Sequence, residues 1–136
     1  MAGDAVPQVR TFLQAQSQAL AALGVDAARI VWDPGIGFGK TVEQNFALLG
    51  RQAELLQDGY PVLAGWSRKS SLGVVTGQPV NDRVAASVAA AVLAVQRGAA
   101  IVRVHDVRET VGALKVLAAT ISGAMPLQAD AQETTR

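Results

Sequence analysis

The order of the predicted elements constrains the fold more than any other feature of this sequence. Short apolar segments typical of β-strands alternate with longer segments that carry apolar residues at helical spacing. The expected strands are residues 28–33, 60–66 and 100–105, and the expected helices after them are residues 41–59, 81–99 and 106–123. Strands that alternate with helices pair in parallel through right-handed crossovers. We therefore expect an α/β fold with three parallel strands.

Residues suited to helix ends support this order. One further helix is expected before the first strand, over residues 6–25, and Gly24 is a residue type that commonly ends a helix. Residues suited to N-caps begin two of the later helices: Thr41, and either Asn81 or Asp82. The chain thus begins with a helix that has no strand before it.

Three strands alone leave two open edges and too few helices to cover both faces of a parallel sheet. We therefore expect the chain to be part of a larger barrel or a truncated chain. Residues 67–80 are expected to form a loop with a short turn, and the polar residues 124–136 a disordered tail after a domain over 1–123.

Composition excludes several classes of function. The 136 residues include 12 Lys and Arg against 11 Asp and Glu, so the basic excess of a general nucleic-acid binder is missing. The sequence has no cysteine and one histidine, which argues against thiolate and multi-histidine metal centres. The first residues resemble no signal peptide, and no apolar run approaches the roughly 20 residues of a membrane span. A cytoplasmic protein is the expectation.

The motif DPGIGFGK, residues 33–40, follows the first predicted strand. The Asp33 carboxylate can accept paired hydrogen bonds from an amino-substituted heterocycle, or it can simply cap the turn. The glycines match neither the phosphate-binding loop nor the dinucleotide fingerprint, but they let a ligand approach the backbone closely. Phe38 either offers its ring to a flat ligand or closes the mouth of the barrel.

Two further motifs follow the other predicted strands. In GWSRKSS, the residues Ser67 and Lys69 share one face of an extended chain while Arg68 turns away, and a solvated basic loop is the alternative. In IVRVHDV, Arg103 and His105 lie about 7 Å apart on one face, a spacing that suits a phosphate or pyrophosphate. Internal salt bridges, with Asp106 or with a carboxylate from another strand, are the alternative. All three motifs are expected at one rim, because the carboxyl ends of parallel strands converge.

DPGIGFGK, GWSRKS and RVHDV, in this order with helices between them, resemble the last three strand ends of dihydropteroate synthase, a TIM-barrel enzyme of folate synthesis. The resemblance implies the C-terminal portion of a TIM (β/α)8 barrel with a pterin-binding site. The implied reaction condenses 6-hydroxymethyl-7,8-dihydropterin pyrophosphate with para-aminobenzoate, giving 7,8-dihydropteroate and pyrophosphate.

The resemblance also implies roles for individual residues. Asp33 would bind the pterin ring and Lys69 would contact the pterin, while Phe38 and Ser67 would line the para-aminobenzoate pocket that sulfonamides occupy. Arg103 and His105 would hold the pyrophosphate. Two further implications are Gly37 as a close-approach position and Lys69, Arg103 and His105 as the catalytic set.

Family segments from the first half of the barrel do not occur in this sequence, including the asparagine that binds Mg²⁺. We therefore expect Mg²⁺ only in the full-length family, little or no turnover by this chain alone, and homodimer formation or other self-association through its apolar surfaces. Two alternatives stay open: a non-catalytic α/β module that binds phosphate, and a pterin-binding barrel of the methyltransferase type.

Overall fold

A computed structural model describes residues 3–123, so the tail predicted over residues 124–136 lies outside the described part of the chain. The α-helices are α1 (Ala5–Ala22), α2 (Val42–Gly50), α3 (Ser70–Thr76), α4 (Val84–Gln96) and α5 (Val107–Ser122). The strands are β1 (Val62–Ala64) and β2 (Ala99–Val102), and the 3₁₀ helices are η1 (Ala27–Arg29), η2 (Gln52–Asp58) and η3 (Val80–Asp82). The predicted α/β class is confirmed.

The sheet is parallel, as the alternation of elements predicts. β1 pairs with β2, and Trp32 forms an isolated parallel bridge with Val62 on the other side of β1. The prediction of a full strand over residues 28–33 is wrong in extent. The first part of that segment forms η1, because the Asp26 side chain accepts a hydrogen bond from the Ala28 amide and starts a helical turn.

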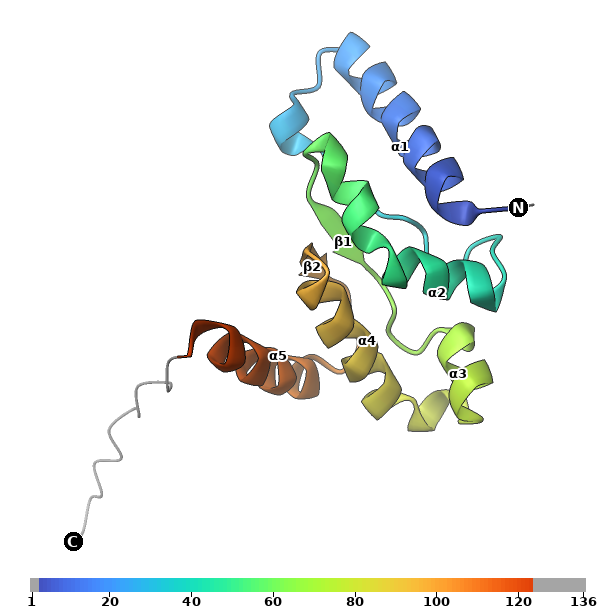
Figure 1. The fold of residues 1–136 in the computed structure, drawn as a ribbon, viewed down its shortest axis with the longest axis vertical. Coiled ribbons are helices and arrows are strands. Elements are labelled where there is room, and N and C mark those ends of the chain that lie inside the picture. The colour runs from blue at the N-terminus through green and yellow to red at the C-terminus, as the bar shows by residue number, and fades with distance from the viewer. Residues whose placement is uncertain (1–2, 124–136) are drawn as a thin grey trace, which may run out of the picture.

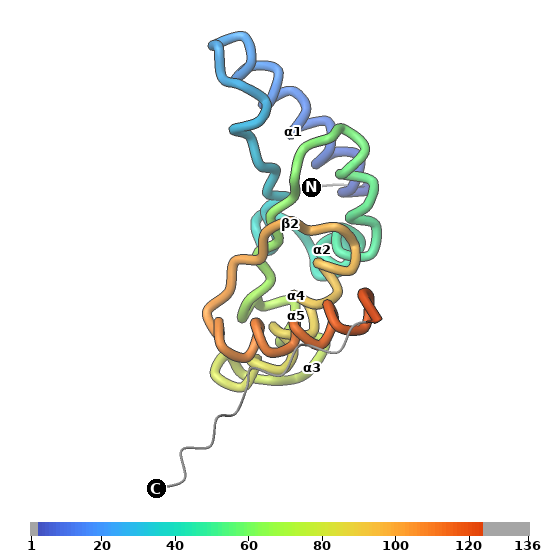
Figure 2. Tube along the Cα trace, turned by 90° about the vertical axis from the view of Figure 1, so that its left-hand side faces the viewer, coloured from blue at the N-terminus to red at the C-terminus, as the bar shows by residue number. Residues whose placement is uncertain are grey.

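The molecule is elongated, with α1 and α5 at opposite ends and the strands between them (Figure 1). The view turned by 90° shows the same separation (Figure 2). α1 lies along α2 and η2, where Arg10 Nε donates to Asp58 Oδ2 at 2.6 Å and Arg51 Nη1 to Asp4 Oδ2 at 2.8 Å. Two ion pairs therefore hold the N-terminal half of α1 against this part of the chain.

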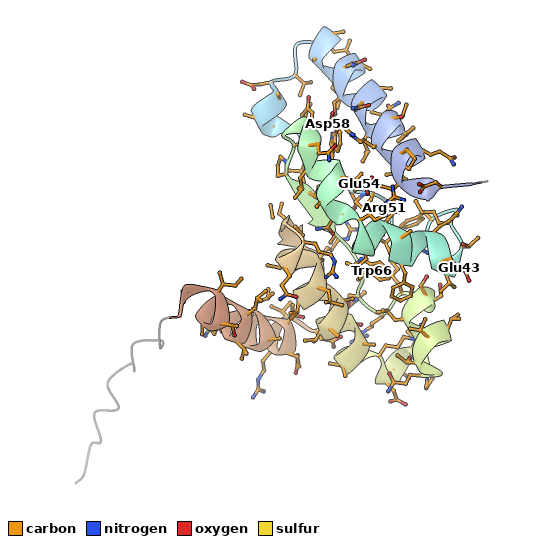
Figure 3. The ribbon with its side chains drawn as sticks, viewed as in Figure 1. Glu43, Arg51, Glu54, Asp58 and Trp66 are labelled. Atoms are coloured by element: carbon orange, nitrogen blue, oxygen red, sulfur yellow. The ribbon has the colours of Figure 1, made fainter. Side chains whose placement is uncertain are left out.

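Two buried tryptophans support the ends of the strands. The Trp32 ring stacks on Tyr60 with 4.9 Å between centroids, and its Nε1 donates to the Ser17 hydroxyl at 2.7 Å. Trp66 lies where α2, α3 and α4 approach one another (Figure 3), with its ring 5.1 Å from that of Phe46. Both tryptophans are almost fully buried, so the loops that follow them start from fixed positions.

Several helix boundaries agree with the sequence. α1 is followed by Gly24 in the left-handed region, with φ of 82°. Thr41 caps α2 through a capping box, in which Gln44 N donates to Thr41 Oγ1 and Thr41 N to Gln44 Oε1. The predictions for Gly24 and Thr41 are confirmed.

The prediction of a single helix over residues 41–59 is wrong. α2 ends at Gly50, and the chain continues as the 3₁₀ helix η2 after Arg51. Glycine weakens a helix interior, and the buried Gln52 side chain donates to the carbonyl oxygens of Ala94 and Arg97 at 2.9 and 3.2 Å. The hydrogen bonds of Gln52 to the end of α4 therefore accompany the end of the regular α-helix at Gly50.

The connection after β1 also differs from the prediction. Residues 67–80 contain the helix α3 rather than a loop with a short turn, because Ser71 and Leu72 are buried and Gly77 ends the helix with φ of 71°. Neither Asn81 nor Asp82 caps α4, since η3 intervenes and Arg83 stands at the N-cap without a side-chain cap.

β2 is shorter than the strand expected over 100–105. It ends at Val102, so Arg103 and His105 lie beyond the strand. The Arg103 amide still donates to Ala64 O at 3.1 Å, which keeps the segment next to β1. None of the helices within residues 3–123 combines the length and apolar character needed to cross a bilayer.

Candidate active site

The ends of the three parallel segments meet, as predicted. Arg103 Nη1, after β2, donates to Asp33 Oδ2, after the Trp32 bridge, at 3.0 Å across 70 positions of the sequence. This ion pair is one of the alternatives that the sequence left open, a salt bridge of Arg103 with a carboxylate from another strand. Both side chains stay accessible, with 59% and 35% exposure, so an anion that binds here competes with Asp33 for Arg103.

The glycine-rich loop is shaped by its own polar groups. Asp33 Oδ1 accepts a hydrogen bond from the Gly35 amide at 2.9 Å, so Asp33 caps this turn while its second oxygen faces Arg103. Gly35, Gly37 and Gly39 have φ of 68°, 83° and 62°, values that only glycine adopts without strain. The turn therefore requires these glycines, whatever ligand binds beside it.

Lys40 braces the same loop, a role that the sequence did not reveal. Its Nζ donates to the carbonyl oxygens of Gly35 and Phe38 at 2.8 and 3.1 Å. Burial of the ammonium lowers the pKa of Lys40, while the nearby Asp33 carboxylate partly opposes this shift. The loop backbone is thus held from inside by a lysine that follows the last glycine.

Phe38 and Lys69 form a contact between two of the loops. Phe38 is 67% exposed, and Lys69 Nζ lies 4.3 Å from the centroid of its ring. A Cβ on Gly37 would lie 3.1 Å from Lys69 Cδ, so the lysine stem passes close over the glycine backbone. The Phe38 ring thus lies exposed beside Lys69, and Gly37 provides room for the lysine side chain.

Ser67 and His105 are joined directly. Ser67 is buried, its Oγ accepts a hydrogen bond from the His105 amide at 3.1 Å, and the same oxygen lies 2.8 Å from His105 Nδ1. The extended chain expected over Ser67 to Lys69 is wrong, because the Lys69 amide donates to Trp66 O at 3.1 Å and Arg68 has φ of 59°, so these residues form a turn. Arg68 points away from the Ser67–His105 contact, and its Nη2 donates to Asp106 Oδ1 at 2.7 Å. That charge-assisted hydrogen bond lowers the pKa of Asp106.

A small pocket joins these groups. It has a volume of about 160 Å³ and is lined by Gly65, Ser67, Lys69, Arg103, Val104 and His105. Three of these side chains can carry positive charge, so the pocket suits a small anion. Its volume lies below the roughly 300 Å³ at which pockets for drug-sized ligands begin, so it accommodates only part of a larger substrate.

Gly65 is a site residue that the sequence did not single out. A Cβ on Gly65 would lie 2.7 Å from Arg103 Nη2, a distance that requires the guanidinium to move. The absence of a side chain at Gly65 therefore lets Arg103 lie against the end of β1 and reach Asp33. Only its position one residue before the GWSRKSS tryptophan signals this role in the sequence.

The fold and the site define an α/β protein in which loops after parallel strands form a cationic pocket beside a carboxylate. Comparison with known proteins gives the family: the model described as "Pterin binding enzyme" matches residues 1–105. The chain belongs to the family of pterin-binding enzymes.

Relatives within this family agree. A dihydropteroate synthase of Haemophilus influenzae is 47% identical over 117 residues, which make up 86% of this chain and 42% of that protein. The crystal structure of dihydropteroate synthase from Stenotrophomonas maltophilia matches with a TM-score of 0.89 and 47% identity, over 92% of this chain and 48% of the other. The Burkholderia cenocepacia enzyme, complexed with 7,8-dihydropteroate, has a TM-score of 0.87 and 55% identity over 90% of this chain and 46% of the other.

The predicted resemblance to dihydropteroate synthase is thus confirmed. The chain spans less than half the length of these relatives.

Proposed function

We propose that this chain forms the C-terminal portion of a (β/α)8 barrel in a dihydropteroate synthase. The reaction is the condensation of 6-hydroxymethyl-7,8-dihydropterin pyrophosphate with para-aminobenzoate. The single observation that carries the proposal is the convergence of Lys69, Arg103 and His105 on one pocket beside Asp33. The similarity of residues 1–105 to pterin-binding enzymes supports the same substrate class.

In this proposal each strand end has one task. Asp33 accepts hydrogen bonds from the pterin edge, and Lys69 contacts the pterin next to the Phe38 ring. Phe38 and Ser67 line the place of para-aminobenzoate, and so of sulfonamides. Arg103 and His105 hold the pyrophosphate at the pocket that they line.

The proposed reaction requires stabilisation of the pyrophosphate leaving group and does not require a general base. The arylamine nitrogen is already a nucleophile, and it forms a bond to the pterin methylene while the bond from that carbon to the pyrophosphate oxygen breaks. The amine then loses a proton, and pyrophosphate leaves with the bonding electrons. Cations at Arg103 and His105 lower the barrier because they stabilise the negative charge that develops on the departing oxygen.

Arg103 changes partner in this scheme. In the structure it donates to Asp33, and an incoming pyrophosphate offers it more negative charge than one carboxylate oxygen. Release from Arg103 also frees Asp33 Oδ2 for the pterin ring. Binding of the pyrophosphate group to Arg103 thus makes Asp33 available to the pterin ring of the same substrate.

The complete site needs groups from the other half of the barrel. Described residues 3–123 contain no grouping of three or more His, Cys, Asp or Glu that could hold a metal ion, so they do not fit a resident Mg²⁺, and no step is assigned to it. We propose that Mg²⁺ acts only in the complete enzyme and that this chain alone turns over little or no substrate. Self-association, a domain boundary near residue 123 and a cytoplasmic location stay predictions.

Two other functions remain to be distinguished by experiment. A non-catalytic phosphate-binding module would bind anions at Arg103 and His105 without preference for a pterin. A barrel of the methyltransferase type would bind the pterin without using para-aminobenzoate.

The test is turnover of the purified chain with dihydropterin pyrophosphate, labelled para-aminobenzoate and Mg²⁺, with and without a separately expressed N-terminal half from a relative. Formation of 7,8-dihydropteroate only in the mixture supports the proposal. Absence of product in a mixture that forms a stable complex would refute it, and pyrophosphate binding without pterin binding would favour the phosphate-binding module.

A further inference from the structure

A buried asparagine connects the glycine-rich loop with the first turn of α3, just after Lys69. Asn45 lies on α2 and is 1% exposed, which makes it one of the most buried side chains described. Its Oδ1 accepts a hydrogen bond from the Gly37 amide at 3.0 Å, and its Nδ2 donates to Ser71 Oγ at 3.0 Å. Gly37 belongs to the glycine-rich loop and Ser71 to the first turn of α3.

The orientation of the amide is set by its partners. A backbone N–H can only donate, so the oxygen of Asn45 must face Gly37 and its NH₂ group must face Ser71. Ser71 is itself 2% exposed, and leaving either partner unsatisfied in such a place is costly. One side chain therefore satisfies groups in two separate segments.

The positions of these partners give Asn45 a role beyond stability. Gly37 immediately precedes Phe38, and Ser71 follows Lys69 by two residues. Phe38 and Lys69 meet with 4.3 Å between the ammonium and the ring centroid. The Asn45 bridge thus joins the two segments one residue away from Phe38 and two residues away from Lys69.

We propose that Asn45 is a positioning residue that holds the Phe38 loop and the Lys69 segment at a fixed spacing. Its amide sets the distance between the ring and the ammonium, and hence the width of the place for the arylamine substrate. This inference rests on the proposed function for the identity of that substrate, but the spacing itself is a property of the chain alone.

Gln52 offers a matched control. It is also a buried amide, with 2% exposure, and it also joins two segments, by donating to the carbonyl oxygens of Ala94 and Arg97. These partners lie at the C-terminal end of α4, not in the loops of the site. Asn45→Leu and Gln52→Leu each remove a buried amide, but only the first removes the bridge between the loops.

The first experiment uses the 136-residue chain in solution. We expect Asn45→Leu to weaken the nuclear Overhauser contacts between the Phe38 ring and the Lys69 side chain, and to accelerate amide exchange at Gly37 by about ten-fold. Gln52→Leu should leave both unchanged. Unchanged Phe38–Lys69 contacts and Gly37 exchange in folded Asn45→Leu would overturn the proposal.

A milder variant keeps the test decisive if Asn45→Leu does not fold. Ser71→Ala removes one partner of the bridge, and we expect weaker Phe38–Lys69 contacts with Gly37 exchange retained. Equal contacts in Ser71→Ala and the parent chain would overturn the proposal.

Activity gives an independent readout. In the mixture with an N-terminal half, Asn45→Leu should raise the KM for para-aminobenzoate about ten-fold with a smaller change in the KM for the pterin substrate. Equal increases in both would point to general destabilisation and contradict a positioning role. If the parent mixture itself has no turnover, the proposed function fails, while the contact and exchange measurements still decide the role of Asn45.

Discussion

Replacement of Gly65 by alanine should disturb the candidate site while leaving the fold intact. The new Cβ would lie 2.7 Å from Arg103 Nη2 and 3.3 Å from its Cζ, so the guanidinium has to leave its position against β1. The obstructing atoms belong to the far end of a flexible side chain, which can swing into solvent. Gly65→Ala should therefore displace Arg103 without disturbing the core.

The expected change in stability is small. Gly65 is not among the glycines with positive φ, so alanine fits its backbone, and the less flexible unfolded chain contributes roughly 0.4–1 kcal/mol in favour of folding. The lost Arg103–Asp33 ion pair is exposed and contributes about 0–1 kcal/mol. These contributions have opposite signs, so the free energy of unfolding should change by no more than about 1 kcal/mol.

The expected change in ligand binding is larger. A hydrogen bond to a charged group contributes roughly 1.5–3 kcal/mol, so loss of the Arg103 contact should weaken pyrophosphate binding by about ten-fold to a hundred-fold. Urea unfolding measures the first quantity, and a titration of the chain with inorganic pyrophosphate followed by NMR measures the second. Equal pyrophosphate affinity in Gly65→Ala and the parent chain would refute the assignment of Arg103 to an anion site.

Three further expectations follow from the same structure. Gly112→Ala, within α5 and with no neighbouring atom within 4 Å of the new Cβ, should raise the free energy of unfolding by about 0.5–1 kcal/mol in urea titrations. Ser17→Ala leaves the buried Trp32 Nε1–H without its acceptor and should lower the same quantity by about 1–3 kcal/mol. Asp106→Asn should be less stable than the parent near neutral pH. The hydrogen bond from Arg68 lowers the pKa of Asp106 below its ordinary value of 3.8, so the ionised carboxylate stabilises the fold fully above that pH. This stabilisation is lost as the pH falls through the lowered pKa. The free energies of unfolding of the parent and the variant should therefore converge in acid.

Local sequence patterns predicted the order of elements and the meeting of the strand ends. Both follow from short stretches of the sequence. The period of the apolar residues distinguishes strands from helices, and parallel pairing then brings the carboxyl ends of the strands together. Asp33, Ser67, Lys69, Arg103 and His105 could therefore be proposed as neighbours before any coordinates were known. Their contacts, such as Arg103 with Asp33, agree with this placement.

Features that depend on tertiary contacts could not be predicted in this way. The helix over residues 41–59 breaks where Gln52 turns toward α4, and nothing near Gln52 in the sequence identifies that partner. Asn45 has the pattern of an ordinary polar residue within a helix, although it is buried and bonds to both Gly37 and Ser71. Gly65 has the pattern of a glycine that ends a strand, and only the path of Arg103 reveals why a side chain is excluded there.

The most direct test of the proposed pyrophosphate site is the effect of Arg103 on turnover in the mixture of this chain with an N-terminal barrel half. Arg103→Gln should be compared with Arg108→Gln, which removes the same charge from an exposed position on α5. We expect Arg103→Gln to lower kcat/KM for the pterin pyrophosphate at least about a hundred-fold, because a charged group at the leaving group is lost, while Arg108→Gln stays close to the parent. Equal activities of the two variants would contradict the claim that these strand ends form the pyrophosphate half of the active site.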